Sequence, residues 1–546
     1  MEILANIVDV LKKQAYYGKI TIANGIIISK ENIGSINPDK PYVLPGFVDS
    51  HVHIESSMVL PQEFALVALS KGTLAAVCDP HEIANVLGMQ GIDFMIKNAK
   101  KTDFLFAFAA PSCVPASSFE NSGAVINSED IEKLMQNENI YALAEMMNYP
   151  GLFNNDIEVL KKINIAKKYS KPIDGHAPGL NKEQSKLYAS YGITTDHECS
   201  KIQEAENKII AGMNILIRQG SAVQNFETLY PLINLYPQKC MFCTDDCHID
   251  KMSSGYINKI VELAVDKGLD IWNVLLAACV NPVKHYKLNL GLLQKDDKAD
   301  FIIVDNLRQF NVLQTYMSGK KVFDCSSLQQ GSEIFSIKYS PNNFQAEKIN
   351  LEDIKLVATS SHINVIKAQD KELFTKKIIC KAKVLNNKIV SDQDNDVLKL
   401  VVVNRYKKAK PSIAFIKGFG LKNAAVCSTI AHDSHNIIAV GTSDDLIISA
   451  INKIIDIKGG IICLDDNKQE ISLPLPIAGL MSNLNYQEVN KKLKDLHDFA
   501  AKHHCLLSEP FMTLAFMALL VIPELKLSDK GLFDSNGFQF ISNIVI

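Results

Sequence analysis

Six side chains that can bind divalent metal ions stand at the ends of short apolar runs in this sequence. They are His51, His53, Glu145, His176, His197 and Asp245. Imidazole and carboxylate groups suit one or two borderline or hard divalent ions. Such an ion lowers the pKa of a coordinated water from about 15.7 to about 7 and so provides hydroxide at neutral pH. The set therefore predicts a metal-dependent hydrolase.

His51 and His53 directly follow the first of these runs. Residues i and i+2 of an extended chain point to the same side, so both imidazoles can reach one ion. A lone His-x-His pair is a weak signal, because histidines also occur as ordinary core residues. The other four groups favour a metal site over ordinary core residues. An apolar core would not place four imidazoles and two acids at matched positions. We interpret the six residues as one site.

The segment DPHE, residues 79–82, ends the second apolar run and brings His81 together with two acids. Asp79 and Glu82 could relay protons beside a metal-activated water. Asp79 could instead cap the helix that follows, and the two roles could coexist.

Further ligand-type residues have several interpretations. Asp246 follows Asp245 and could lie on the substrate side or in a second site. The segment AHDSHN, residues 431–436, contains His432 and His435, which could face the metal-binding set, bind a metal of their own or belong to a polar loop.

Three cysteines near Asp245 could also be read as zinc ligands. Cys240 and Cys243 have the Cys-x-x-Cys spacing, and Cys247 follows them. A closed zinc site needs a second pair of ligands, and small thiols are common in apolar strands. We therefore favour buried core thiols.

The elements that position these groups alternate between short β-rich runs and amphipathic stretches. The runs are Val43–Ser50, Thr73–Cys78, Phe104–Ala110, Tyr141–Met146, Pro172–Asp174, Ile193–Thr195, Asn214–Gln219 and Cys240–Thr244. The helical stretches between them include Ser128–Asn137, for which Ser128 is the expected N-cap. This alternation predicts an α/β fold with a (β/α)8 barrel of the TIM type, whose active site lies at the carboxyl ends of the strands.

The flanks of the barrel have a different character. Gly18–Lys30 and Ala299–Phe323 are β-rich and contain turn glycines. We expect a small β-sandwich built from both flanks, residues 1–44 and 289–335, around a catalytic barrel at 45–288. A C-terminal α/β domain is expected at 350–546, with strands at Leu398–Val403 and Ile437–Gly441.

Composition excludes several classes of protein. The 546 residues carry a net charge of -3 with no long basic run, which argues against a nucleic-acid binder. We expect no signal peptide and no membrane span. The 12 cysteines are scattered through the chain and favour reduced thiols in the cytoplasm.

Several motifs together resemble the amidohydrolase superfamily and, within it, the bacterial adenine deaminases. The motifs are PGFVDSHVHIESS, CDPHE, AEMMNYPG, DGHAPG, TTDHE and FCTDD, followed in the C-terminal region by FIKGFGLKNAAVCSTIAHDSHNIIAVGT and LPLPIAGLMS. The likeness spans nearly the whole chain, and the C-terminal motifs are specific to this subgroup. Many superfamily members bridge two metals with a carboxylated lysine, whereas this sequence offers Glu145 at the fourth strand, as adenine deaminases do.

The resemblance implies hydrolytic deamination of adenine to hypoxanthine and ammonia by a metal-bound hydroxide. It implies a binuclear Mn²⁺ centre, with Fe²⁺ as the alternative and Zn²⁺ less favoured. Carried over, the six residues above are the metal ligands, and Asp245 also moves the proton of the attacking water. Glu82, supported by Asp79, would protonate the ring nitrogen. This role requires a raised pKa, which burial beside other carboxylates can provide. The expected partners are adenine and water, in a homo-oligomer.

Two other readings remain open. The first is another hydrolase of the same superfamily that acts on a cyclic amide or an N-acetyl group. The second is a metal-binding or assembly protein without catalysis, which is disfavoured because the ligands and both proton-relay acids are present.

Overall fold

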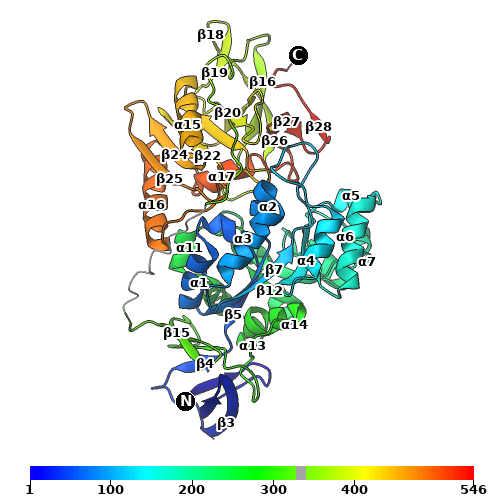
Figure 1. Ribbon diagram of the computed structural model, residues 1–546, viewed down its shortest axis with the longest axis vertical. Helices are drawn as coiled ribbons and strands as arrows, with labels where there is room; N and C mark the ends of the chain where they lie inside the picture. Colours follow the sequence, from blue (N-terminus) through cyan, green and yellow to red (C-terminus); the bar gives the residue numbers. More distant parts are fainter. Residues whose placement is uncertain (328–339, 546) are drawn as a thin grey trace.

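The computed structural model describes residues 1–327 and 340–545. The small β-domain was expected to include residues 289–335. Of these, residues 328–335 lie outside the described residues, as does Ile546. The described residues form three parts stacked along the long axis of the molecule (Figure 1). A small sheet lies at one end, a barrel in the middle, and a larger sheet with helices at the other end.

A barrel of eight parallel strands occupies the middle of the described chain. Its strands are β5 (Phe47–Val52), β6 (Thr73–Cys78), β7 (Leu105–Ala110), β8 (Ile140–Met146), β9 (Ile173–Gly175), β10 (Thr195–Asp196), β11 (Asn214–Arg218) and β12 (Cys240–Cys243). They pair in parallel from β5 to β9 and from β10 to β12. The barrel closes where Val52 bridges Asp245 and the His53 amide donates to the Asp245 carbonyl at 3.1 Å. The predicted (β/α)8 barrel is confirmed.

The first predicted run, Val43–Ser50, is divided between two sheets. Pro45 has no N–H to donate to a ladder, so the strand is interrupted there. The residues before it form β4 (Tyr42–Leu44), which belongs to the small sheet, and those after it form β5. This break is where the chain passes from one part of the molecule to the next.

Helices cover the outside of the barrel. They are α1 (Pro61–Ser70), α2 (His81–Leu87), α3 (Met89–Ala99), α4 (Ser128–Met135), α5 (Tyr149–Phe153), α6 (Ile157–Lys168), α7 (Lys182–Ser190), α8 (Ile202–Ile210), α9 (Phe226–Leu229), α10 (Leu232–Leu235), α11 (Ile249–Ser254), α12 (Ile257–Asp266), α13 (Ile271–Leu275) and α14 (Asn281–Tyr286). Ser128 is not the N-cap of α4. Asn127 takes that place, because its side chain accepts from the Asp130 amide while Asp130 accepts from the Asn127 amide.

The small sheet combines strands from both flanks of the barrel, as predicted. In the described residues its order is β15 (Lys320–Asp324), β14 (Val312–Met317), β13 (Phe301–Val304), β4, β1 (Glu2–Asp9), β2 (Gln14–Ala23) and β3 (Ile26–Gly34). Ile7, Ile20 and Phe301 belong to a core that this sheet encloses by itself. It contributes no side chain to the metal-binding set described below.

A mixed sheet forms the C-terminal part of the described chain. Its order is β17 (Lys376–Lys381), β16 (His362–Lys367), β21 (Ser412–Lys417), β20 (Leu398–Val403), β23 (Ile437–Gly441), β22 (Ala424–Ser428), β24 (Gly460–Asp465) and β25 (Glu470–Pro474). The predicted strands Leu398–Val403 and Ile437–Gly441 are confirmed. Side chains alternate between two cores: Val401 packs in the core below α15 (Asp444–Ile457), and Leu400 packs on the opposite side, towards the barrel.

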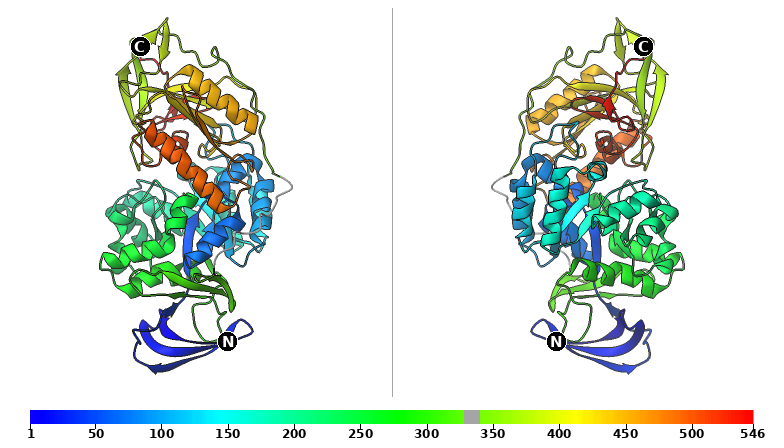
Figure 2. Two further views of the ribbon diagram at one scale, coloured as in Figure 1. Left: turned by 90° about the vertical axis from the view of Figure 1, so that its left-hand side faces the viewer. Right: turned by 90° about the vertical axis from the view of Figure 1, so that its right-hand side faces the viewer.

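Two helices connect this sheet to the barrel. α16 (Tyr486–Lys502) reaches down beside α11, where Asn490 donates to Ser253 Oγ at 2.8 Å (Figure 2). α17 (Pro510–Phe516) is fully buried between the two parts. Smaller sheets contain β18 (Lys383–Leu385) with β19 (Lys388–Val390), and β26 (Leu525–Ser528) with β27 (Gly531–Asp534) and β28 (Gln539–Phe540).

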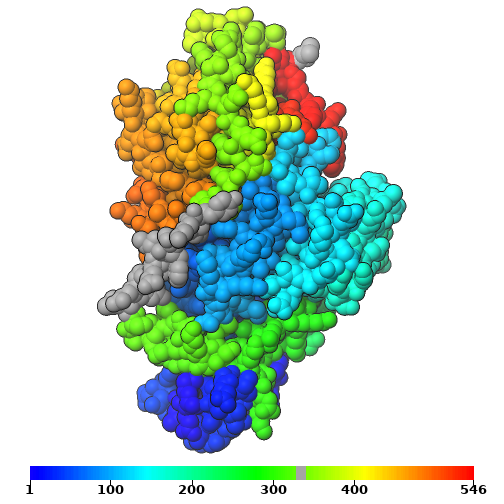
Figure 3. Space-filling model, in the orientation of Figure 1, coloured from blue at the N-terminus to red at the C-terminus, as the bar shows by residue number. Residues whose placement is uncertain are grey.

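The C-terminal part, yellow-green to red in Figure 3, sits directly on the barrel. Asn121 of the barrel donates to the Asp529 carboxylate from its amide at 2.9 Å, and Ser528 donates to the Phe119 carbonyl at 3.0 Å. The helices of residues 1–327 and 340–545 include none with the length and apolarity needed to cross a bilayer.

Candidate active site

The six predicted ligands all lie at the carboxyl ends of barrel strands. Each residue lies in the last part of a strand or in the first residues after it, and each side chain is buried. His51 and Glu145 are inside β5 and β8, His53, His176 and His197 directly follow β5, β9 and β10, and Asp245 follows β12 by two residues. Because parallel strands end at one rim, residues nearly 200 positions apart in the chain meet there.

Glu145 stands at the centre of the cluster. Its Oε1 lies 3.3 Å from His53 Nε2 and 3.7 Å from His51 Nε2. Its Oε2 lies 2.6 Å from His176 Nδ1 and 3.2 Å from His197 Nε2. The two oxygens of one carboxylate therefore face two different pairs of imidazoles.

Asp245 faces the same cluster from the closing edge of the barrel. Its Oδ1 lies 3.2 Å from His53 Nε2, and its Oδ2 contacts Arg218 Nη1. Burial alone would raise the pKa of Asp245, but Arg218 and the neighbouring histidines hold it well below its usual range. Its backbone φ of 58° is unusual for a residue other than glycine. The carboxylate is therefore ionised and fixed towards the histidines.

The donor atoms fit divalent ions. His51 Nε2 is buried and has no hydrogen-bond partner among the described residues. Overlapping groups of ligand atoms lie within 4.8 Å of one another: His51, His53 and Asp245; His51, Glu145 and His197; and His53, Asp79, His81 and Glu145. Imidazole and carboxylate donors that share members in this way can hold more than one ion.

Two histidines of the C-terminal part contact the Glu82 carboxylate. His432 Nδ1 lies 2.6 Å from its Oε1, and His435 Nε2 contacts its Oε2. The segment AHDSHN therefore faces the barrel rim. Burial alone would raise the pKa of Glu82, but His432, His435 and His81 hold it well below its usual range. The expectation of a pKa raised by burial beside carboxylates is wrong, because the charges of three histidines outweigh the effect of burial.

Asp79 and His81 link Glu82 to the ligand cluster. Asp79 Oδ2 pairs with His81 Nδ1 at 3.0 Å, and His81 Nε2 lies 3.2 Å from Glu82 Oε1. Asp79 Oδ1 also accepts from the His81 amide at 3.1 Å, but the N-cap of α2 is Pro80 rather than Asp79. The Asp79 carbonyl faces His53 Nδ1 at 3.0 Å, which orients that imidazole.

Asp246 lies beside the ligand cluster, between the barrel and the C-terminal part. Its Oδ1 accepts from Ser56 Oγ and lies 4.0 Å from His432 Nε2. The thiols of Cys240, Cys243 and Cys247 are free and buried, as favoured from the sequence.

Sequence analysis missed Arg218 and Glu198. Arg218 ends β11, and its Nη1 lies 2.6 Å from Glu198 Oε1 as well as against Asp245. Glu198 Oε1 is also 3.5 Å from His197 Nε2. A charged residue at the end of an apolar run, as in NILIR, was a visible signal for Arg218, and the motif TTDHE already contained Glu198.

Hydrogen bonds to the buried Asp49 carboxylate hold the ends of two strands together. Asp49 accepts from the amides of His51 and Thr244 at 3.2 and 3.1 Å, and Tyr256 donates its hydroxyl to the same carboxylate. Burial raises the pKa of Asp49 to about 6. This carboxylate joins β5 to the segment that carries Asp245 and so sets the distance between the two sides of the site.

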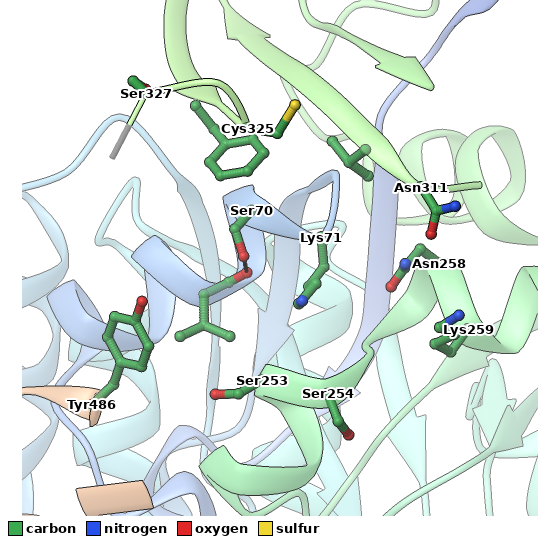
Figure 4. A pocket seen from close by; sticks show the side chains of 13 residues that line it. Ser70, Lys71, Ser253, Ser254, Asn258, Lys259, Asn311, Cys325, Ser327 and Tyr486 are labelled. Carbon is green, nitrogen blue, oxygen red and sulfur yellow. Dashed lines mark hydrogen bonds between the residues drawn. The ribbon is translucent and has the colours of Figure 1, made fainter. Parts of the chain in front are cut away.

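Two cavities differ in size and in position relative to the candidate site. A cavity of about 10 Å³ lies beside His432 and Phe511, room for about one water. A cavity of about 530 Å³ lies outside the barrel, lined by groups such as Ser70, Lys71 and Lys259 (Figure 4). The described residues that line it include no histidine or acid, so it cannot be the hydrolytic site.

A closed parallel barrel with histidines and carboxylates at its carboxyl rim defines a metal-dependent hydrolase of the amidohydrolase class. The model of the amidohydrolase family matches residues 42–322, and the model of the adenine deaminase C-terminal domain matches residues 372–539.

Full-length relatives narrow this class further. An adenine deaminase of Methanosarcina barkeri is 48% identical over 98% of both chains, and one of Borreliella burgdorferi is 47% identical over 99% of both. A solved N-acetyl-D-glucosamine-6-phosphate deacetylase from Mycobacterium smegmatis is 15% identical, with a TM-score of 0.46, over 59% of this chain and 100% of that one. On its full-length relatives, the chain belongs to the adenine deaminase family.

Proposed function

We propose that this chain hydrolyses adenine to hypoxanthine and ammonia. The observation that carries the proposal is the full-length similarity to proteins named adenine deaminase. The similarity includes the C-terminal domain, from which His432 and His435 reach Glu82. Both histidines come from the C-terminal domain, so a hydrolase that consisted of the barrel alone would lack these two contacts with Glu82.

The six rim residues are proposed to hold two divalent ions, with Mn²⁺ first, Fe²⁺ second and Zn²⁺ less favoured. Their donor set and the central place of Glu145 support a pair of ions. When bound, such ions supply hydroxide at neutral pH by lowering the pKa of coordinated water to about 7. The other steps depend on the chain's own side chains.

Asp245 is proposed to accept the proton of the attacking water and pass it to the departing amine. Its ionised state, held by Arg218, supports a role as proton acceptor. Its rim position at 3.2 Å from His53 Nε2 supports contact with the nucleophile. Arg218 keeps the carboxylate in this orientation and is a positioning residue.

Glu82 and His432 are proposed to act as one proton donor for the ring nitrogen beside the amine-bearing carbon. They share a hydrogen bond of 2.6 Å, and the acids Glu82 and Asp246 outweigh burial and raise the pKa of His432 to about 9. Two groups coupled in this way titrate as a pair, so the pair keeps a proton at neutral pH although Glu82 alone would not. Asp79 supports it by orienting His81.

A substrate panel followed by ammonia release tests the reaction. Adenine is expected to be turned over with release of one ammonia per hypoxanthine. Opening of a cyclic amide or removal of an N-acetyl group, without turnover of adenine, would favour the other hydrolases of this superfamily instead.

We also propose that the chain is cytoplasmic and forms a homo-oligomer. We propose three domains: a small β-domain at 1–44 with 289–335, a catalytic barrel at 45–288, and a C-terminal domain at 350–546. The twelve free thiols are compatible with a reducing compartment. Size-exclusion chromatography with light scattering measures the oligomeric state.

A further inference from the structure

A second group of metal-binding side chains lies outside the rim cluster. It contains His248, His497 and Glu509, and no residue of the rim set. His248 precedes α11 of the barrel, His497 lies on α16, and Glu509 precedes α17. The group therefore spans the contact between the barrel and the C-terminal part, where α16 descends beside α11 (Figure 2).

Three donor atoms converge in this group. Glu509 Oε2 lies 3.7 Å from His248 Nδ1 and 3.6 Å from His497 Nε2. All three atoms lie within 4.8 Å of one another. Two ligands at about 2.0–2.1 Å from a tetrahedral ion are about 3.3 Å apart, so small side-chain shifts bring these atoms to zinc-ligand spacing.

None of these three atoms has a hydrogen-bond partner among the described residues. His248 and Glu509 are each only 2% exposed and the His497 side chain is 22% exposed, but all three donor atoms are buried, so bulk solvent does not replace the missing partners. Buried polar atoms without partners are rare and point to an ion or a water that completes the site. The distances of 3.6 and 3.7 Å exceed those of a hydrogen bond, so a proton shared between Glu509 and either histidine does not satisfy them.

The surroundings orient the donors. Lys251 Nζ lies 2.7 Å from Glu509 Oε1, which leaves Oε2 to face the histidines. The ring of Phe511 packs edge-on against His497 with centroids 5.1 Å apart. Asp250 Oδ1 is buried nearby, also with no hydrogen-bond partner in the described chain, and its charge acts on His497.

We propose that His248, His497 and Glu509 form an additional metal site of the zinc class, with Asp250 or a water as the fourth ligand. Two imidazoles and a carboxylate are a donor set that zinc accepts. A cavity of about 490 Å³ lies beside the group and is lined by Lys251 and Glu509 among others.

The ion would fasten the C-terminal part to the barrel close to the catalytic rim. His248 follows Asp245 by three residues, and the C-terminal part delivers His432 to Glu82. The site would therefore maintain the contact on which the Glu82–His432 pair depends. It does not rest on the identity of the substrate.

Metal counting on the full-length protein tests the site. Metal-free protein is loaded with Zn²⁺, freed of excess ion, and analysed by mass spectrometry for zinc per chain. We expect His497→Gln and Glu509→Gln each to hold one zinc fewer than the unmodified chain. His504→Asn, which changes an exposed histidine just beyond the same helix, is expected to lose none. Equal zinc content in all four proteins would overturn the proposal.

A second measurement uses the unmodified chain and does not depend on the folding of a variant. Crystals of the zinc-loaded protein are expected to show an anomalous zinc peak between His248, His497 and Glu509, apart from any peaks at the barrel rim. The absence of a peak at this position, with zinc present at the rim, would refute the site.

Discussion

His432 Nδ1 lies 2.6 Å from Glu82 Oε1, although the two residues are 350 positions apart in the chain. Glu82 belongs to α2 at the barrel rim, and His432 precedes β23 of the C-terminal sheet. The contact makes the C-terminal part a component of the candidate active site rather than an appended domain. Together with the contact from His435, it places two imidazoles against Glu82, where only burial beside other carboxylates was expected.

Glu82→Gln removes the carboxylate but keeps its shape. Turnover of adenine is expected to fall by about 10²–10⁴-fold, the usual range for loss of general acid–base catalysis. Metal content should not change, because Glu82 is not in the proposed ligand set. Steady-state kinetics with metal analysis checks this, and unmodified turnover at full metal content would show that Glu82 has no catalytic role.

His432→Gln tests the pair from the C-terminal side. Without the imidazole the proton on the pair is lost, so kcat is expected to fall by at least about 10²-fold while KM changes little. The pH profile should also lose its alkaline limb, because the pKa of His432 is raised to about 9 beside Glu82 and Asp246. His504→Asn is the matched control. A variant with the profile of the unmodified chain would place the donor elsewhere.

Arg218→Met is expected to destabilise the fold as well as the site. Removing this buried guanidinium leaves the carboxylates of Asp245 and Glu198 without their cationic partner. Breaking a buried ion pair from one side costs about 3–5 kcal/mol of unfolding free energy. Urea denaturation measures the loss.

Arg308→Met removes an exposed ion pair with Asp266 and serves as the control. It should change stability by less than about 1 kcal/mol. Equal effects of the two substitutions would mean that Arg218 does not stabilise the rim carboxylates.

Lys526→Met tests a buried amine outside the site. Burial lowers the pKa of Lys526 from 10.5 to about 7. Between these values the unfolded chain holds a proton that the folded chain lacks, so this residue makes stability rise with pH from about 7 towards 10.5. The Tm of the variant relative to the unmodified chain should therefore fall between pH 7 and pH 9.

Lys530→Met, which changes an exposed neighbour of Lys526, is the matched control for the substitution itself. Differential scanning fluorimetry at matched ionic strength makes the comparison. A relative Tm of the Lys526 variant that stayed constant with pH would mean that Lys526 is charged in the folded chain.

The barrel and the meeting of the six candidate ligands at its rim could be predicted from sequence because these residues stand at or near the ends of five apolar runs. His51, Glu145 and Asp245 are local signals, and the rule that parallel strands end at one rim brings them together. The N-cap of α4 was misplaced by one residue because Asn127 and Ser128 are both good capping residues.

Contacts across parts of the chain could not be predicted in the same way. Nothing in the spacing of Glu82 and His432 reveals that they meet, since their contact depends on how the C-terminal sheet docks on the barrel. The same holds for His248 and His497. Arg218 could not be predicted from the metal-ligand pattern, because a guanidinium is not a metal ligand.

The most direct test of the account is an adenine assay on metal-free protein reconstituted separately with Mn²⁺, Fe²⁺ and Zn²⁺. The affinity of such donor sets favours zinc over manganese, so the protein as isolated is expected to contain the less active ion. The account predicts no turnover without metal, and release of hypoxanthine and ammonia after addition of Mn²⁺ or Fe²⁺. Metal-loaded protein that binds two ions at the rim but leaves adenine unchanged would contradict it.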